Sequence, residues 1–160
     1  MVNIKEAARA AVTAYGLASE KGGNTSVPLQ EVAESLASFY LTNFTSFTLG
    51  QVTTLPQDPA PGVLKQLQLL NESGLGTDIR PCAARIEVVS SQSAMCWITF
   101  EIFPRTKKID RWTWTNIYGF RLGEPRKNGL DGGWEFTNAD QEFQKLLERV
   151  PDFYTGGKVP

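Results

Sequence analysis

The sequence predicts an α+β fold in which three N-terminal helices pack on a strongly curved antiparallel sheet and a short C-terminal helix follows. Two patterns lead to this expectation. Apolar residues recur at helical spacing in the first half of the chain, whereas from residue 79 onward they alternate with a period of two. Helices and strands segregated in this way are typical of α+β proteins. A curved sheet wrapped on helices would leave a cone-shaped cavity, and a ligand would sit there.

The first half of the chain predicts three helices. The first covers residues 3–21, and the second runs from a cap at Ser26 to about residue 41. A loop over residues 57–62 contains Asp58 followed by a proline, which is a cap-and-first-turn signature, and the third helix follows it. Glycines after the leucine-rich stretch end this helix.

The strands are expected mainly in the second half. Five segments carry the pattern, and they are residues 44–49, 83–90, 95–105, 111–122 and 133–138. The segment 111–122 alternates most clearly. One of its faces would carry Trp112, Trp114, Asn116, Tyr118 and Phe120.

A short helix is expected to close the chain. Asn138 and Gln141 form a capping-box pattern in front of it, and Pro151 ends it. The tail over residues 155–160 is expected to be mobile.

Length and composition limit the classes of protein. The 160 residues predict a single domain, 1–160, with a core over about 4–150. A formal net charge of −1 argues against nucleic-acid binding and against a polybasic membrane surface. No apolar run is long enough to span a membrane, and the first residues lack the apolar stretch of a secretory signal, so we expect a cytoplasmic protein.

The two cysteines, Cys82 and Cys96, lie on two arms of one predicted hairpin. The register puts Cys82 opposite about residue 100, so the two thiols should not face each other. We therefore expect two small buried thiols in a reducing compartment, and no disulfide.

The chain contains no histidine. This absence removes Ser-His-Asp and Cys-His catalysis, histidine proton shuttles and most catalytic zinc sites. Any general acid or base must therefore be Asp, Glu, Tyr, Lys or Cys. We predict no metal site and no cofactor.

Three segments carry a resemblance to a known family. They are the run from Ser38 into 44–48, the strand 112–121, and the stretch 133–140. Their order resembles the nuclear transport factor 2-like superfamily in its SnoaL-like branch, with ketosteroid isomerases, scytalone dehydratases and polyketide cyclases. The resemblance implies a cone-shaped fold and a homodimer formed through the sheet. The superfamily contains enzymes, carriers and dimerisation modules, so fold does not give function.

The ketosteroid isomerase relatives allow a comparison by position. Tyr15 matches the first-helix tyrosine that holds the substrate oxyanion in that family. Thr48 stands where the family has its aspartate base, and Tyr118 stands where it has a second oxyanion donor. Two donors are therefore retained, whereas the base is missing. Scytalone dehydratases use a pair of histidines, which this chain lacks.

Four polar residues are candidates for contacting a ligand. Asn116 would orient a carbonyl or hydroxyl group on the cavity wall, or else bond to a neighbouring strand or across a dimer interface. Tyr15, Tyr118 and Tyr40 could donate hydrogen bonds to an oxygen, or could simply pack their rings in the core.

The remaining candidates are aromatic or acidic. Trp112 and Trp114, with Trp97, could wall a flat ligand, or could belong to the core or a dimer face. Thr48 is included as a ligand contact. Glu101 is the best general-base candidate, because burial in an apolar strand would raise its pKa; the alternative is a cross-strand ion pair on a solvated face.

Two functions stay open. One is an uncharacterised SnoaL-like protein that holds a small apolar or aromatic molecule in the cone, without a conventional His/Asp catalytic set. The other is an isomerase, dehydratase or cyclase that acts on a cyclic or aromatic natural-product intermediate through Tyr and Asn donors. The discriminating features are the cavity volume and the direction in which Asn116 points.

Overall fold

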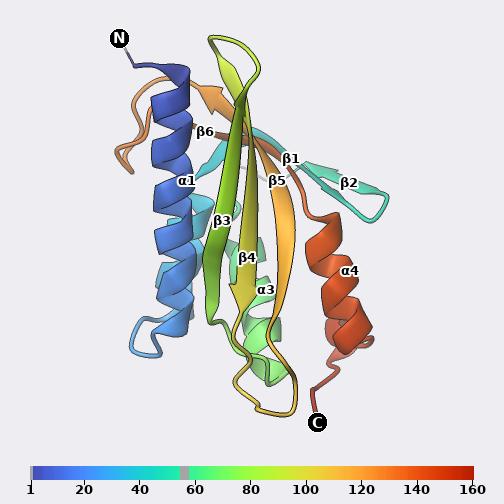
Figure 1. Cartoon of the computed structure of the whole chain (residues 1–160). Coiled ribbons are helices and arrows are strands. Elements are labelled where there is room, and N and C mark those ends of the chain that lie inside the picture. Colours follow the sequence, from blue (N-terminus) through green and yellow to red (C-terminus); the bar gives the residue numbers. More distant parts are fainter. Residues whose placement is uncertain (1, 55–57) are drawn as a thin grey trace.

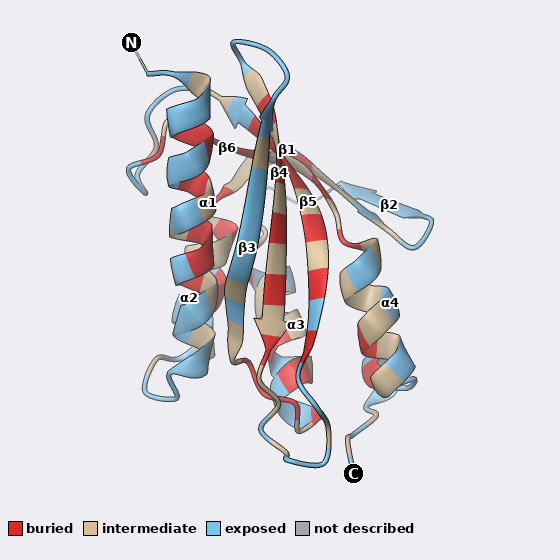
Figure 2. Cartoon of the chain, in the orientation of Figure 1, coloured by how far each residue is buried: buried red, intermediate tan, exposed pale blue. Residues whose placement is uncertain are grey.

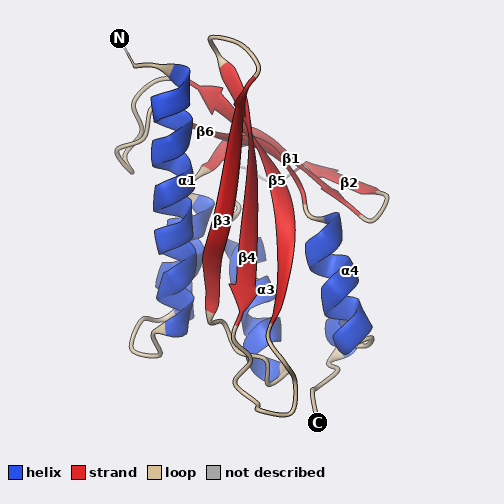
Figure 3. Ribbon diagram, viewed as in Figure 1, coloured by secondary structure: helices blue, strands red, loops and turns tan. Residues whose placement is uncertain are grey.

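The computed structural model describes residues 2–54 and 58–160. Within these residues, α-helices and strands follow one another along the chain (Figures 1 and 3). Their bounds are α1 (Ile4–Glu20), α2 (Leu29–Ala37), β1 (Tyr40–Thr48), β2 (Gln51–Thr54), α3 (Ala60–Glu72), β3 (Ile79–Val88), β4 (Ser93–Ile102), β5 (Trp112–Leu122), β6 (Gly132–Asn138) and α4 (Asp140–Arg149). Two short 3-10 helices complete the set, over Lys21–Gly23 and Phe153–Thr155.

The six strands form one curled sheet in the order β2-β1-β6-β5-β4-β3. In Figure 1, α1 lies beside β3, α2 lies behind α1, α3 lies behind β3 and β4, and α4 lies at the side of β5. The predicted α+β cone is therefore confirmed. One pairing differs from the expected antiparallel arrangement, because β1 and β6 run parallel.

Helix boundaries depend on local caps. The Asn3 side chain accepts hydrogen bonds from the amides of Lys5 and Glu6, at 2.8 and 3.4 Å, and so starts α1. Asp58 accepts from the amide of Ala60 at 3.1 Å in front of α3, as its signature predicts. Gln57, at the start of the predicted loop, lies outside the described residues.

Two predicted boundaries of α2 were wrong. Ser26 does not cap this helix, since its amide and hydroxyl both donate to Asn24 in the preceding turn. The helix also ends at Ala37, whereas about residue 41 was expected. The reason is that Tyr40 already belongs to β1 and pairs with Trp134 of β6.

The capping box of α4 does not form. Asn138 accepts from the amide of Asp140 at 3.1 Å, but Gln141 accepts from the backbone amide of Thr115 on β5, at 3.0 Å. This contact ties the first turn of α4 to the sheet. The tail is also held at one point, where the amide of Val159 donates to the carbonyl oxygen of Ser73 at 2.9 Å.

The hairpin of β3 and β4 has the expected register. Cys82 lies at an irregularity between the pairs formed by Phe100 and Thr99, and Cys96 pairs with Tyr118. Both thiols are unpaired. One expectation was wrong, because Cys82 is exposed, and only Cys96 is buried.

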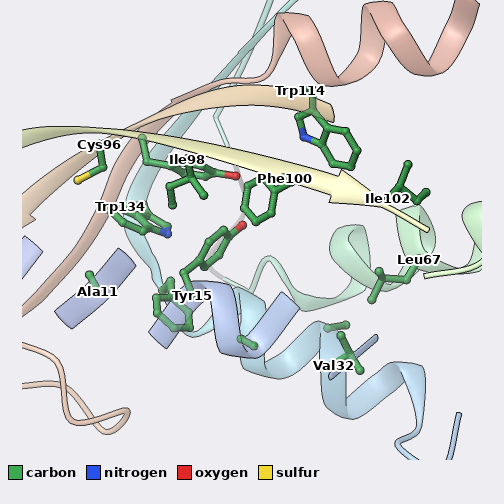
Figure 4. Packing of buried hydrophobic residues seen from close by; sticks show 14 of the residues in the cluster. Ala11, Tyr15, Val32, Leu67, Cys96, Ile98, Phe100, Ile102, Trp114 and Trp134 are labelled. Carbon is green, nitrogen blue, oxygen red and sulfur yellow. The ribbon is translucent and has the colours of Figure 1, made fainter. Parts of the chain in front are cut away.

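One face of the sheet is buried against the helices, and the other is largely exposed to solvent. Along β4, buried and half-buried residues alternate strictly, and β3 is mostly exposed (Figure 2). On β5, the row from Trp112 to Phe120 is buried on the side of the helices, as predicted. The core therefore fills the space between this face and the helices (Figure 4).

Candidate functional site

A cavity of about 340 Å³ opens between the concave face of the sheet and the helices. Residues from α1, α2, α3, α4 and five strands line it, so the whole fold contributes to its walls. Most of the lining is apolar or aromatic. This volume is at the lower end of the range for ligand sites of drug-sized molecules, about 300–1,000 Å³.

Tyrosines from three elements meet at the cavity. The hydroxyl groups of Tyr15 on α1 and Tyr40 on β1 lie 2.9 Å apart. The ring of Tyr118 on β5 meets the ring of Tyr15 edge to face, with centroids 5.1 Å apart. Figure 4 shows Tyr15 pointing from its helix towards Phe100 on the sheet.

Burial keeps these phenols protonated. It raises the pKa of Tyr40 to about 12, and it raises the pKa of Tyr15 well above 10, with further increases from the neighbouring Tyr118 and Tyr40. The pKa of Tyr118 is also raised, chiefly by burial. At neutral pH the three hydroxyl groups therefore keep their protons. One of the Tyr15–Tyr40 pair donates to the other, which leaves the second member of the pair and Tyr118 as donors to a ligand oxygen.

Asn116 connects the tyrosines to a carboxyl group. Its side chain is 2% exposed, and its amide nitrogen donates to the hydroxyl of Tyr118 at 3.2 Å and to Glu142 Oε1 at 2.7 Å. Within the described chain, Asn116 Oδ1 has no hydrogen-bond partner. The same holds for the indole nitrogen of Trp114, two residues away on the same face of β5.

Glu142 lies in the first turn of α4 and is half-buried at the cavity wall. Burial raises the pKa of its carboxyl group, and the hydrogen bond from Asn116 opposes this increase only in part. A carboxyl group in this setting can accept a proton or pair with a positive charge.

Comparison with known proteins supports the fold. No family model matches the chain, and no curated protein matches it. Among solved structures, an NTF-2 like protein of unknown function from Shewanella oneidensis MR-1 superposes with a TM-score of 0.58 at 13% identity, over 84% of this chain and 96% of that one. The chain has the nuclear transport factor 2-like fold.

Two further structures with this fold carry names that state an activity. A putative scytalone dehydratase from Novosphingobium aromaticivorans DSM 12444 superposes with a TM-score of 0.56 at 13% identity, over 84% of this chain and 80% of that one. The hexachlorocyclohexane dehydrochlorinase LinA-type3 from Novosphingobium barchaimii LL02 gives 0.55 at 12% identity, over 84% and 86%. At these identities the likeness concerns the fold alone.

The nuclear transport factor 2-like cone brings together five of the eight residues singled out from the sequence. They line one cavity, and they are Tyr15, Tyr40, Trp114, Asn116 and Tyr118.

The other three lie elsewhere. Thr48 is at the end of β1, where its hydroxyl is 3.2 Å from that of Ser46. Trp112 is buried beyond the cavity lining, with the Arg149 guanidinium 4.4 Å from its ring centre. Glu101 lies on the outer face of β4, where it pairs with Arg111 at 3.7 Å.

Sequence reasoning missed Glu142. It directly precedes Phe143, the first residue of the apolar stripe of the last helix, so helical periodicity places it beside the buried face. That pattern could have identified Glu142 as a candidate. Its contact with Asn116 could not be predicted, because the two residues are far apart in the sequence.

Residues 2–54 and 58–160 contain no group of three or more Cys, Asp or Glu side chains placed to hold an ion. Likewise, in this part of the chain no helix has both the length and the apolar composition needed to cross a membrane.

Proposed function

We propose that this chain binds a small, mainly apolar molecule in the cone cavity. Tyr15, Tyr40, Tyr118 and Asn116 would contact its polar group, and Trp114 would pack against its body. The observation that carries the proposal is the convergence of three protonated phenols and a buried amide on one apolar cavity. Ligand sites are characteristically of this kind, with apolar walls and a few convergent polar groups.

Binding has more support than an isomerase, dehydratase or cyclase reaction. The family's base position is taken by Thr48, which does not accept a proton usefully. Glu101, the carboxylate that the sequence favoured as a base, is paired with Arg111 on the opposite face of the sheet. Neither residue therefore supplies a base to the tyrosine cluster. Glu142, the carboxyl group at the cavity, accepts a hydrogen bond from Asn116, and no hydrogen bond joins it to a tyrosine hydroxyl among the described residues.

A cavity-blocking variant tests the proposal. Val63 on α3 lines the cavity, whereas Gln68 on the same helix is exposed and does not line it. We expect neutral aromatic probes, indole and 2-naphthol, to bind the native protein in calorimetric titration. Val63→Trp should weaken binding by about tenfold or more, because the larger ring fills the site, and Gln68→Trp should not. Equal binding to all three proteins, or no binding to any, would contradict the proposal.

A homodimer through the outer face of the sheet is a second part of the proposal. Trp97 on β4 is half-buried there without a covering helix, and the Arg85 guanidinium is 3.9 Å from its ring centre. The face also carries charges of both signs, including the pair of Arg121 and Glu135. A second copy of the chain would present complementary charges to this face.

Light scattering on a sizing column tests the dimer. We expect the native chain to have twice the mass of one copy at micromolar concentration. Trp97→Glu should yield monomers because it replaces the apolar ring in the interface by a charged group that would lose its hydration there. The matched variant Val89→Glu, at an exposed position near the tip of the β3–β4 hairpin, should remain dimeric. If the native protein has the mass of one copy at every concentration, the dimer is ruled out.

The proposal also places the chain in the cytoplasm. Two unpaired cysteines, one of them exposed, support a reducing compartment.

A further inference from the structure

Glu142 is the sole charged side chain among the described residues that line the cavity. The other polar members of the lining are neutral hydroxyl and amide groups. A ligand in this cavity therefore meets one acidic group and no basic one. Charge of this kind discriminates between ligands, because an anion would be repelled and a cation attracted at low local dielectric.

Asn116 adds a second acceptor at the same place. Its nitrogen donates to both Tyr118 and Glu142, so its oxygen is left for another partner. That oxygen is unpartnered among the described residues, and the side chain is 2% exposed. A buried acceptor without a hydrogen bond costs about 1–3 kcal/mol, so a ligand that donates to it gains affinity.

Aromatic rings surround these two acceptors. Trp114 and Tyr118 flank Asn116 on the same face of β5, and Phe143 follows Glu142 on α4. Across the cavity, Tyr40 and Phe44 line the wall with stacked rings whose centroids are 4.4 Å apart. Aromatic faces attract organic cations, and the attraction increases when the site is shielded from water.

We propose that the cavity is specific for an organic amine, whose ammonium group binds between Glu142 and Asn116 Oδ1 while its apolar body packs on the aromatic wall. This inference rests on the proposed function and specifies the ligand class of that site. An ammonium group supplies several N–H donors and a positive charge, and so satisfies both acceptors at once. A neutral alcohol supplies one donor and leaves the carboxylate without a counter-charge.

The pKa of Glu142 provides a second test of this inference, because amine binding should depend on pH. The titratable groups that interact with it are the phenols of Tyr40 and Tyr118 on the sheet and Tyr154 after α4. All three have raised pKa values and stay neutral, and no basic side chain among the described residues contributes to the pKa shift of Glu142. Burial raises its pKa in the empty cavity, and a bound ammonium would lower it again. Amine binding should therefore release a proton below that pKa and tighten as pH rises through it.

Three probes with one phenyl body test the charge preference. They are 2-phenylethylamine, 2-phenylethanol and phenylacetate, titrated calorimetrically into the native protein. We expect the amine to bind about tenfold or more tightly than the alcohol, and the anion to bind weakest. We also expect proton release on amine binding in acidic buffers. The observed binding enthalpy of the amine should then depend on the ionisation enthalpy of the buffer, whereas that of the alcohol should not.

Glu142→Gln is the decisive variant, since glutamine keeps the shape and a hydrogen bond to Asn116. It should abolish the preference for the amine, so that the amine and the alcohol bind with similar affinity. Glu148→Gln removes an exposed carboxylate from the same helix and should retain the preference. If the alcohol binds as tightly as the amine, or if Glu142→Gln keeps the preference, the amine inference fails and the binding site itself stands. If no probe binds and the indole titration also fails, both are overturned.

Discussion

Trp134→Ala is expected to lower the free energy of unfolding by about 3–5 kcal/mol, the range for deleting a large aromatic side chain from a packed core. Trp134 lies on β6 and is 0% exposed, and its side chain faces α1. Its ring packs against Tyr15 at 5.6 Å and Tyr118 at 5.1 Å, centroid to centroid, and edge to face against Phe120 at 6.0 Å. The substitution would remove the support that fixes both tyrosines at the cavity.

Urea unfolding monitored by circular dichroism measures this loss, and Trp97→Ala provides a matched comparison. Trp97 is half-buried on the outer face, and its principal contact is the guanidinium of Arg85. Its removal should cost about 1 kcal/mol, which is typical of a cation–π contact at a partly exposed site. Equal losses for the two tryptophans would show that the core does not lie between the helices and the sheet.

The row of residues on β5 shows what the sequence could predict. Trp112, Trp114, Asn116, Tyr118 and Phe120 alternate with polar or smaller residues, and a strand has a period of two. Their common face therefore followed from local sequence. The cavity residue Asn116 was found for the same reason, since a polar group within a buried aromatic row requires a partner. Tyr118 was found through the resemblance to the ketosteroid isomerases.

Glu101 shows where the same reasoning stops. Its strand is apolar on both faces, with Trp97 on one and Ile98 and Phe100 on the other. Alternation then gives the two sets of residues but does not say which set faces the core. Only the pairing with β3 and β5, and the helices packed on one side, places Glu101 outside and next to Arg111.

The strand β2 and the direction of β6 were not predictable from local pattern. All four residues of β2 are exposed, and Val52 is the one apolar residue among them, so the segment carries no alternating apolar pattern. The turn before it uses Leu49 and Gly50, both at positive φ, and the leucine is not a residue typical of such turns. The parallel pairing of β1 with β6 joins segments far apart in the chain, and no local pattern records it.

Glu142 was missed because its environment is created by tertiary contacts. Seen locally, it is one of several charged residues in a short polar helix. It becomes a cavity residue because Gln141 accepts a hydrogen bond from the amide of Thr115 on β5, and Asn116, next to Thr115, donates to Glu142. The functional charge therefore depends on how the last helix docks on the sheet.

Asn116→Asp is expected to destabilise the protein by about 3 kcal/mol or more at about pH 8, as for an uncompensated buried charge. The substitution keeps the shape of the side chain but replaces the nitrogen, 2.7 Å from Glu142 Oε1, by a carboxylate oxygen. Two buried carboxyl groups in contact cannot both ionise without cost, so the pKa of each is raised in the folded state. The folded protein then binds more protons than the unfolded one, and stability must fall as pH rises above about 4.

Chemical unfolding of native protein and variant across this pH range measures the effect, and the double variant Asn116→Asp/Glu142→Gln isolates its cause. Glutamine removes one charge and supplies an N–H donor to the new aspartate, so it should recover most of the loss at about pH 8. The single variant should also approach native stability at about pH 4, where both carboxyl groups are protonated. A loss independent of pH, and unchanged in the double variant, would mean that Asn116 and Glu142 are not in contact. The polar side of the cavity would then lack the carboxylate on which amine selectivity depends.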